Sequence, residues 1–145
     1  MTEVKMGGRT IPLYYSTYEL IAIQREIGCT GHQLRDEVFG IRQADEDDPE
    51  SIVLDCVTDM EKTERLGKLL TILGNAGLEE SGQEADLTVK WVLRRMKPTL
   101  IMGYALAAMA EINEGNRVET PVSEEDKGAV DEGLEEQQAK KQPGN

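Results

Sequence analysis

The sequence predicts a mainly α fold: a small helical domain with an N-terminal β-hairpin and a disordered acidic C-terminal tail. Apolar residues recur at helical spacing through most of the chain, a Gly-Gly pair divides the first fifteen residues, and the last stretch has few large apolar side chains. With 145 residues, of which 39% are hydrophobic, the chain suits one compact domain, expected over residues 1–116.

The hairpin is expected over residues 3–15. Apolar and polar residues alternate on both sides of Gly7–Gly8, a pair that supplies a turn tolerating positive φ. Two short strands are marginal in water on their own, so the hairpin must pack against the helices that follow.

Two short helices are expected between residues 17 and 39. Ser16–Glu19 has the S/T-x-x-E form of a capping box, in which side chains satisfy the amide groups that a helix start leaves open. Gly28 provides a stop, and Thr30–Gln33 repeats the capping pattern before the second helix.

The acidic run Asp45–Glu50 predicts a solvated loop, because its five carboxylates repel one another and cannot be buried together. It lacks the central glycine of a calcium-binding loop, so no metal site is predicted there. We favour one long helix that starts with Asp48 as N-cap and ends at Gly74–Gly77, because apolar residues recur at three- and four-residue steps. The alternative is a strand that ends at Val57, followed by a new helix with a third capping box at Thr58–Glu61.

Two further helices are expected on either side of Pro98. Asp86 is the expected N-cap of the first, and the second runs from Pro98 to Asn113 with Gly115 as its C-cap. Residues 117–145 carry eight acidic and four basic side chains, few large apolar ones and repeated Gly and Gln, which predicts a disordered tail.

Charge and composition disfavour several classes of function. The 16 basic and 28 acidic side chains leave a formal net charge of −12, which argues against nucleic acid and membrane surfaces as partners. The longest uncharged run, Pro98–Ala110, is too short to cross a bilayer. One histidine and two cysteines offer neither a nucleophile paired with a base nor a zinc ligand set, so we predict no enzyme, no cofactor and no metal. Few cysteines and no apolar leader predict a cytoplasmic protein.

The helix expected from Pro98 to Asn113 is apolar on nearly every side. Two interpretations stay open: a central core helix covered all round, or a helix with one arc exposed as a contact surface, since exposed apolar patches mark interfaces. Methionine suits such a surface because its flexible side chain adapts to different partners. Trp91 lies among basic residues and is either packed under their stems or an interface anchor. The candidate partner-binding residues are Trp91, Met102, Leu106 and Met109.

The order of these features resembles the small tail assembly chaperones of long-tailed bacteriophages and related prophages. The resemblance covers roughly residues 3–116. It rests on a Gly-Gly hairpin ending in IPLYYSTYEL, a helix closing at REIGCTG, a helix ending LLTILGNAGLEE, an apolar last helix and an acidic tail.

This resemblance implies a non-enzymatic role in the host cytoplasm. Family members coat the long, aggregation-prone tape measure protein and help recruit tail tube subunits. We therefore expect the tape measure protein as the main partner, with the tail tube protein and further copies of the chain beside it. The composition leaves one alternative, a small acidic regulatory protein whose carboxylates imitate the phosphates of DNA and occupy a basic partner.

Overall fold

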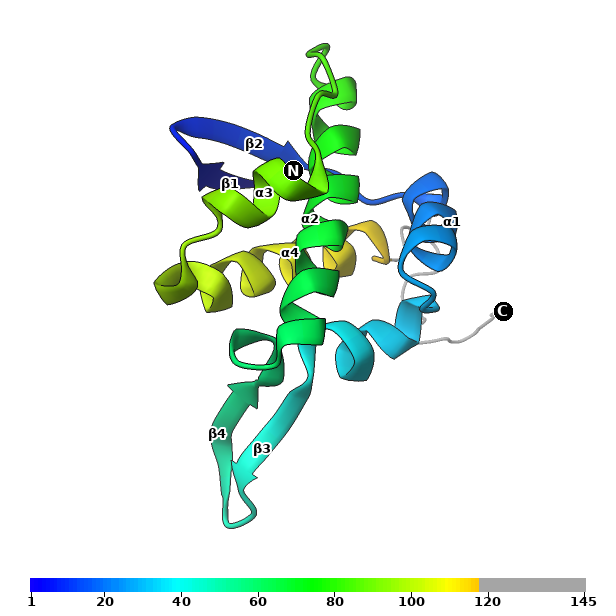
Figure 1. Cartoon of the computed structure of the whole chain (residues 1–145). Coiled ribbons are helices and arrows are strands. Elements are labelled where there is room, and N and C mark those ends of the chain that lie inside the picture. The colour runs from blue at the N-terminus through cyan, green and yellow to red at the C-terminus, as the bar shows by residue number, and fades with distance from the viewer. Residues whose placement is uncertain (118–145) are drawn as a thin grey trace, which may run out of the picture.

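The computed structural model describes residues 1–117, and its fold is mainly α with two small antiparallel hairpins. The long helix α2 (Met60–Glu80) runs through the middle of the molecule, and α4 (Ile101–Gly115) crosses it (Figure 1). Helices α1 (Thr17–Glu26) and α3 (Val89–Arg95) lie on different sides of α2. Apart from Arg117, the predicted tail lies outside the described residues.

The predicted N-terminal hairpin is confirmed. Strands β1 (Thr2–Met6) and β2 (Arg9–Leu13) pair antiparallel. Strand β2 lies against α2, and just beyond it the Tyr14 N–H donates to the Leu73 carbonyl at 3.0 Å. The hairpin is therefore part of the core, as the instability of isolated strands requires.

The first two predicted capping boxes and the stop at Gly28 are also confirmed. The Glu19 carboxylate accepts the Ser16 N–H at 2.9 Å ahead of α1, and Gly28 leaves the helix with φ +86°. The second box precedes two short helical turns, η1 (Gly31–Gln33) and η2 (Arg35–Phe39).

The predicted long helix from Asp48 is wrong. A second hairpin occupies its first part, formed by β3 (Ile41–Asp45) and β4 (Asp48–Leu54), and it projects from the body of the molecule (Figure 1). β-Branched Ile52 and Val53 favour a strand, and the acidic run becomes the exposed hairpin tip rather than a loop between helices.

The alternative, a strand followed by a new helix, is correct in outline, but the strand ends at Leu54 rather than Val57 and the N-cap is Asp59 rather than Thr58. After the turn η3 (Asp55–Val57), α2 begins with Asp59 as its N-cap, whose carboxylate accepts the N–H groups of Glu61 and Lys62. The cap satisfies donors that would otherwise be left open at the helix start.

The predicted end of this helix at Gly74–Gly77 is wrong as well, because α2 continues to Glu80. These glycines serve close packing. A side chain at Gly77 would collide with the Pro12 carbonyl, and a Cβ at Gly74 would lie 2.6 Å from Leu87 Cδ1. Intimate contact with the hairpin and with Leu87 therefore outweighs the low helix propensity of glycine.

The helices around Pro98 differ from prediction only at their ends. Helix α3 takes Thr88 as its N-cap, while Asp86 pairs instead with Arg9 at 3.2 Å. The turn η4 (Pro98–Leu100) precedes α4, which begins at Ile101 and includes Gly115, so the C-cap is Asn116 rather than the predicted Gly115. Within residues 1–117, no helix is both long and apolar enough to cross a membrane.

Candidate protein-binding surface

Helix α4 is covered on one side rather than all round. Its inward face packs against β1, α2 and η3. The Thr2 N–H of β1 donates to the buried Glu111 carboxylate at 2.8 Å, and the Tyr104 hydroxyl donates to the Lys5 carbonyl at 3.4 Å. The interpretation as a central core helix therefore holds for this face alone. Its buried apolar residues are Ile101, Tyr104, Ala105, Ala108 and Ile112.

The opposite side of α4 carries a row of residues that we call the α4 outer face: Met102, Leu106, Met109 and Asn113. Met102 is 44% and Leu106 52% exposed, while Met109 is partly buried at the edge of the core. Steps of four, three and four residues align these side chains in the spacing of a coiled-coil seam. The candidate partner-binding residues of α4 therefore lie on the side of the helix that faces away from the core.

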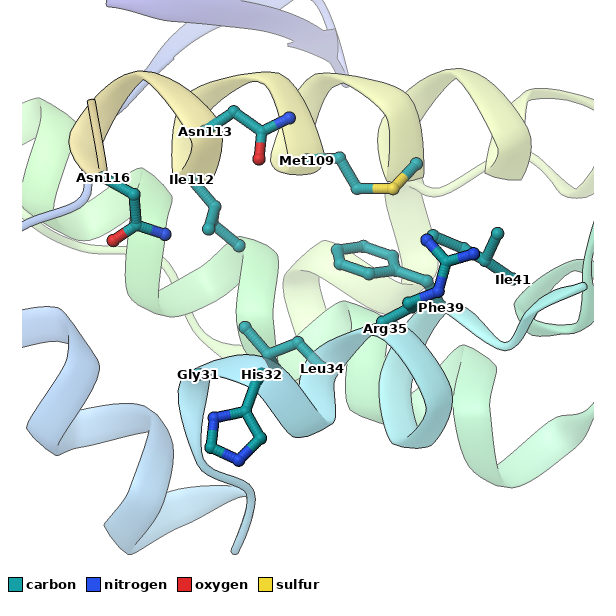
Figure 2. A pocket seen from close by; sticks show the side chains of 10 residues that line it. All are labelled: Gly31, His32, Leu34, Arg35, Phe39, Ile41, Met109, Ile112, Asn113 and Asn116. Atoms are coloured by element: carbon teal, nitrogen blue, oxygen red, sulfur yellow. The ribbon is translucent and has the colours of Figure 1, made fainter. Parts of the chain in front are cut away.

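A groove lies beside this face, between α4 and the turns η1 and η2 (Figure 2). Its volume is about 340 Å³. Met109 belongs to both the α4 outer face and the groove, because its side chain extends from α4 toward Phe39 and Ile41. The outer face and the groove therefore adjoin at Met109.

Arg35 supplies the charge of the groove. Its guanidinium reaches from η2 toward α4, whereas the His32 ring points away from α4 (Figure 2). No Asp or Glu lines the groove, and Arg35 has no ion pair with any residue from 1 to 117. The groove is thus a locally cationic site in an acidic chain.

Trp91 does not share the α4 outer face. Its ring lies under two guanidinium groups, that of Arg9 at 5.5 Å and that of Arg95 at 5.1 Å from the ring centre. These contacts tie α3 to the first hairpin. A neighbouring basic residue, Arg95, does lie on the ring as expected, but through its guanidinium group rather than its stem. A role for Trp91 as a partner anchor stays a prediction.

The buried cysteines are poorly suited to covalent chemistry. Cys29 and Cys56 are both free and buried, and burial raises the pKa of each thiol above its usual value. The reactive thiolate is therefore scarce at neutral pH. No group of His, Cys, Asp or Glu side chains within residues 1–117 has the arrangement of a metal site.

Several surface residues were not predicted from the sequence. Leu100 is 51% exposed, because it lies in η4, before the helix begins. Arg35 and Phe39 of η2 and Ile41 at the start of β3 line the same groove as Met109 only in the folded chain. A helical wheel of a single segment carries no signal for such an arrangement.

Comparisons of the chain with protein-family models, with curated proteins and with solved structures find no match. The function proposed next therefore stands on the α4 outer face, the adjoining groove and the resemblance of the sequence.

Proposed function

We propose that the protein is a tail assembly chaperone that binds the tape measure protein of its phage or prophage through the α4 outer face. The observation that carries the proposal is the row of apolar side chains at seam spacing on a helix otherwise built into the core, in which Met102 and Leu106 are exposed and Met109 is partly buried. A seam of this kind accepts a second helix lying nearly parallel or antiparallel to it.

The chemistry of the surface suits a helical client. A long helical protein with an apolar stripe aggregates when the stripe is exposed, and a row of Met and Leu side chains covers such a stripe without demanding one exact sequence. Asn113 places a polar group at the end of the row, where it favours one register. The net charge of −12 keeps coated complexes apart by repulsion.

Co-expression tests this proposal. The full chain is produced with the tape measure protein encoded just downstream, and the soluble yield of the client is compared with that obtained without the chain. We expect a several-fold rise with the native chain and its loss with Leu106→Lys. Met60→Lys is the matched control, because Met60 is 83% exposed at the start of α2 and is not part of the α4 outer face. An unchanged yield with the native chain contradicts the proposal.

The acidic regulatory alternative has its own structural support. The β3–β4 tip carries Asp45, Asp47 and Asp48 on a projecting hairpin, where a basic partner can reach them. Such an interaction weakens steeply with salt, whereas burial of the α4 outer face does not. Binding to the tape measure protein that persists at high salt favours the chaperone.

A further inference from the structure

We infer that the helix bound by the α4 outer face carries carboxylates along the edges of its apolar stripe, an inference that rests on the proposed function. Lys97 precedes the seam and Arg35 lies beside its other end. Exposed Asp36 and Glu37 follow Arg35 in η2, but neither lines the groove, and Glu37 is paired with Arg65 at 3.7 Å. Opposite charges flanking an apolar seam set which partner helix fits and in which register.

The N-terminal end of the seam is basic. No Asp or Glu occurs between residues 87 and 110, a stretch that holds Lys90, Arg94, Arg95 and Lys97. Lys97 is exposed, and its carbonyl accepts the Leu100 N–H at 2.8 Å, which places it one turn before α4. A partner helix that extends past Met102 beyond the start of α4 therefore comes to Lys97, whereas the Arg95 guanidinium lies over Trp91.

The other end of the seam is cationic as well. There Arg35 reaches toward α4 beside Met109, in a groove with no carboxylate in its lining. The first carboxylate of α4, that of Glu111, is buried against the Thr2 N–H, and the next, that of Glu114, is paired with Arg117 at 3.5 Å. Both acidic groups of α4 are thus already engaged within the chain.

The net charge of −12 does not reverse this local preference. At physiological ionic strength charges are screened over about 8 Å, so contacts at the seam edge depend on the nearest side chains. Carboxylates on the edge of the partner helix are attracted to Lys97 and Arg35, whereas lysines or arginines on that edge are repelled by them. A second copy of α4 offers a poorer match, since Glu114 is its only exposed carboxylate.

Three synthetic helical peptides test the inference by fluorescence anisotropy with the full chain. Each has Leu at seam spacing over three heptads, and the flanking positions are Glu in one, Gln in the second and Lys in the third. We expect the Glu peptide to bind roughly tenfold more tightly than the Lys peptide at low salt, with the preference shrinking as salt rises. Equal binding, tighter binding of the Lys peptide or no binding overturns the inference.

Reversing the charges of Arg35 and Lys97 tests whether these two side chains cause the preference for the Glu peptide. The double variant Arg35→Glu with Lys97→Glu should lose or invert the preference, and Lys68→Glu on α2 is the single-charge control, with circular dichroism to verify folding. A preference that survives the double variant overturns the inference. Self-association that Leu106→Lys abolishes and the Glu peptide does not displace also overturns it, in favour of a second copy.

Failure of the two proposals is distinguishable. If the chain raises the yield of the tape measure protein but shows no preference for the Glu peptide, the charge inference is wrong and the chaperone proposal stands. If the preference is found and the yield is unchanged, the client is another acidic helix.

Discussion

Gly77 and Gly103, both inside helices, have opposite surroundings. A Cβ at Gly77 would run into the Pro12 carbonyl, a backbone group that cannot rotate away, whereas a Cβ at Gly103 would meet nothing within 4 Å. Gly77 lets α2 approach the hairpin closely. Gly103 lowers the helix propensity of α4 and allows no close contact within residues 1–117 in exchange.

The two glycines therefore predict opposite effects of alanine. Gly77→Ala should lower the free energy of unfolding by about 2 kcal/mol or more through overpacking. Gly103→Ala should raise it by roughly 0.5 kcal/mol, because alanine is the better helix former. Urea unfolding of both variants measures the difference, and a harmless Gly77→Ala contradicts the close approach described for α2.

Neighbouring positions on α4 give a second residue-scale prediction. Ala105→Lys should cost on the order of 3 kcal/mol, because Ala105 is fully buried and an unpaired charge there has no water. Leu106→Lys should leave the melting temperature nearly unchanged and abolish client binding. Circular dichroism with a pull-down separates the two, and unfolding of Leu106→Lys would place that side chain in the core.

The structure exposes Met102 and Leu106, as the contact-surface interpretation of the helix requires, because both lie on one regular helix; their role in partner binding stays a prediction. A helical wheel fails at the groove, since Arg35 and Phe39 reach Met109 through packing between segments far apart in sequence. Local periodicity thus predicts one wall of the candidate surface, and only the tertiary structure adds the other.

At the scale of elements, the first two capping boxes were more reliable than hydrophobic periodicity, whereas the single N-caps predicted at Asp48 and Asp86 were wrong. The capping boxes at Ser16 and Thr30 start helical segments, and the alternative start before Met60 is the real one. Periodicity alone joined β4 to α2, because apolar residues at three- and four-residue steps also arise by chance in a strand followed by a helix. The pairing of Ile41 with Leu54 across the hairpin joins residues that are distant in sequence, so the periodicity of the segment after Asp48 does not reveal it.

The N-cap of α2 predicts a pH dependence. Hydrogen bonding from the Lys62 N–H chiefly, with the Lys62 charge and the Glu61 N–H, lowers the pKa of Asp59 below its usual 3.8. A lowered pKa in the folded state means that the stabilisation is complete above the unfolded-state value and disappears as pH falls through the folded-state value. Stability contributed by Asp59 should therefore decline only below about pH 4.

Two substitutions check the assignment to this cap. Asp59→Asn retains a capping oxygen that does not titrate, so its melting temperature should depend less on pH below 4 than that of the native chain. Asp59→Ala should be less stable at neutral pH. If the melting temperatures of Asp59→Asn and of the native chain fall equally as the pH drops below 4, the role of this carboxylate is contradicted.

For the whole molecule, charge is distributed unevenly. The acidic hairpin tip projects from the body, while the stretch from 87 to 110 holds cations and no carboxylate. The predicted fold class was correct as mainly α with an N-terminal hairpin, and the second hairpin was missed. Net charge could be predicted from composition, but its placement depends on which segments the fold brings together.

Deletion of residues 118–145 should leave the melting temperature of the remaining chain unchanged within about 2 °C, because the sequence of that segment has few large apolar side chains to bury. Differential scanning calorimetry of both lengths measures this. A large drop would show that the segment contributes to the core.

Methionine methyl NMR tests the central claim most directly, because the six methionines sample different surroundings. The full chain with labelled ε-methyl groups is titrated with a soluble segment of the tape measure protein. The account predicts shifts at Met102 and Met109 on the α4 outer face and none at Met60 on α2 or at buried Met6. The account is contradicted if, at a saturating concentration of the client, the Met102 and Met109 methyl signals do not shift, or if only the Met60 signal shifts.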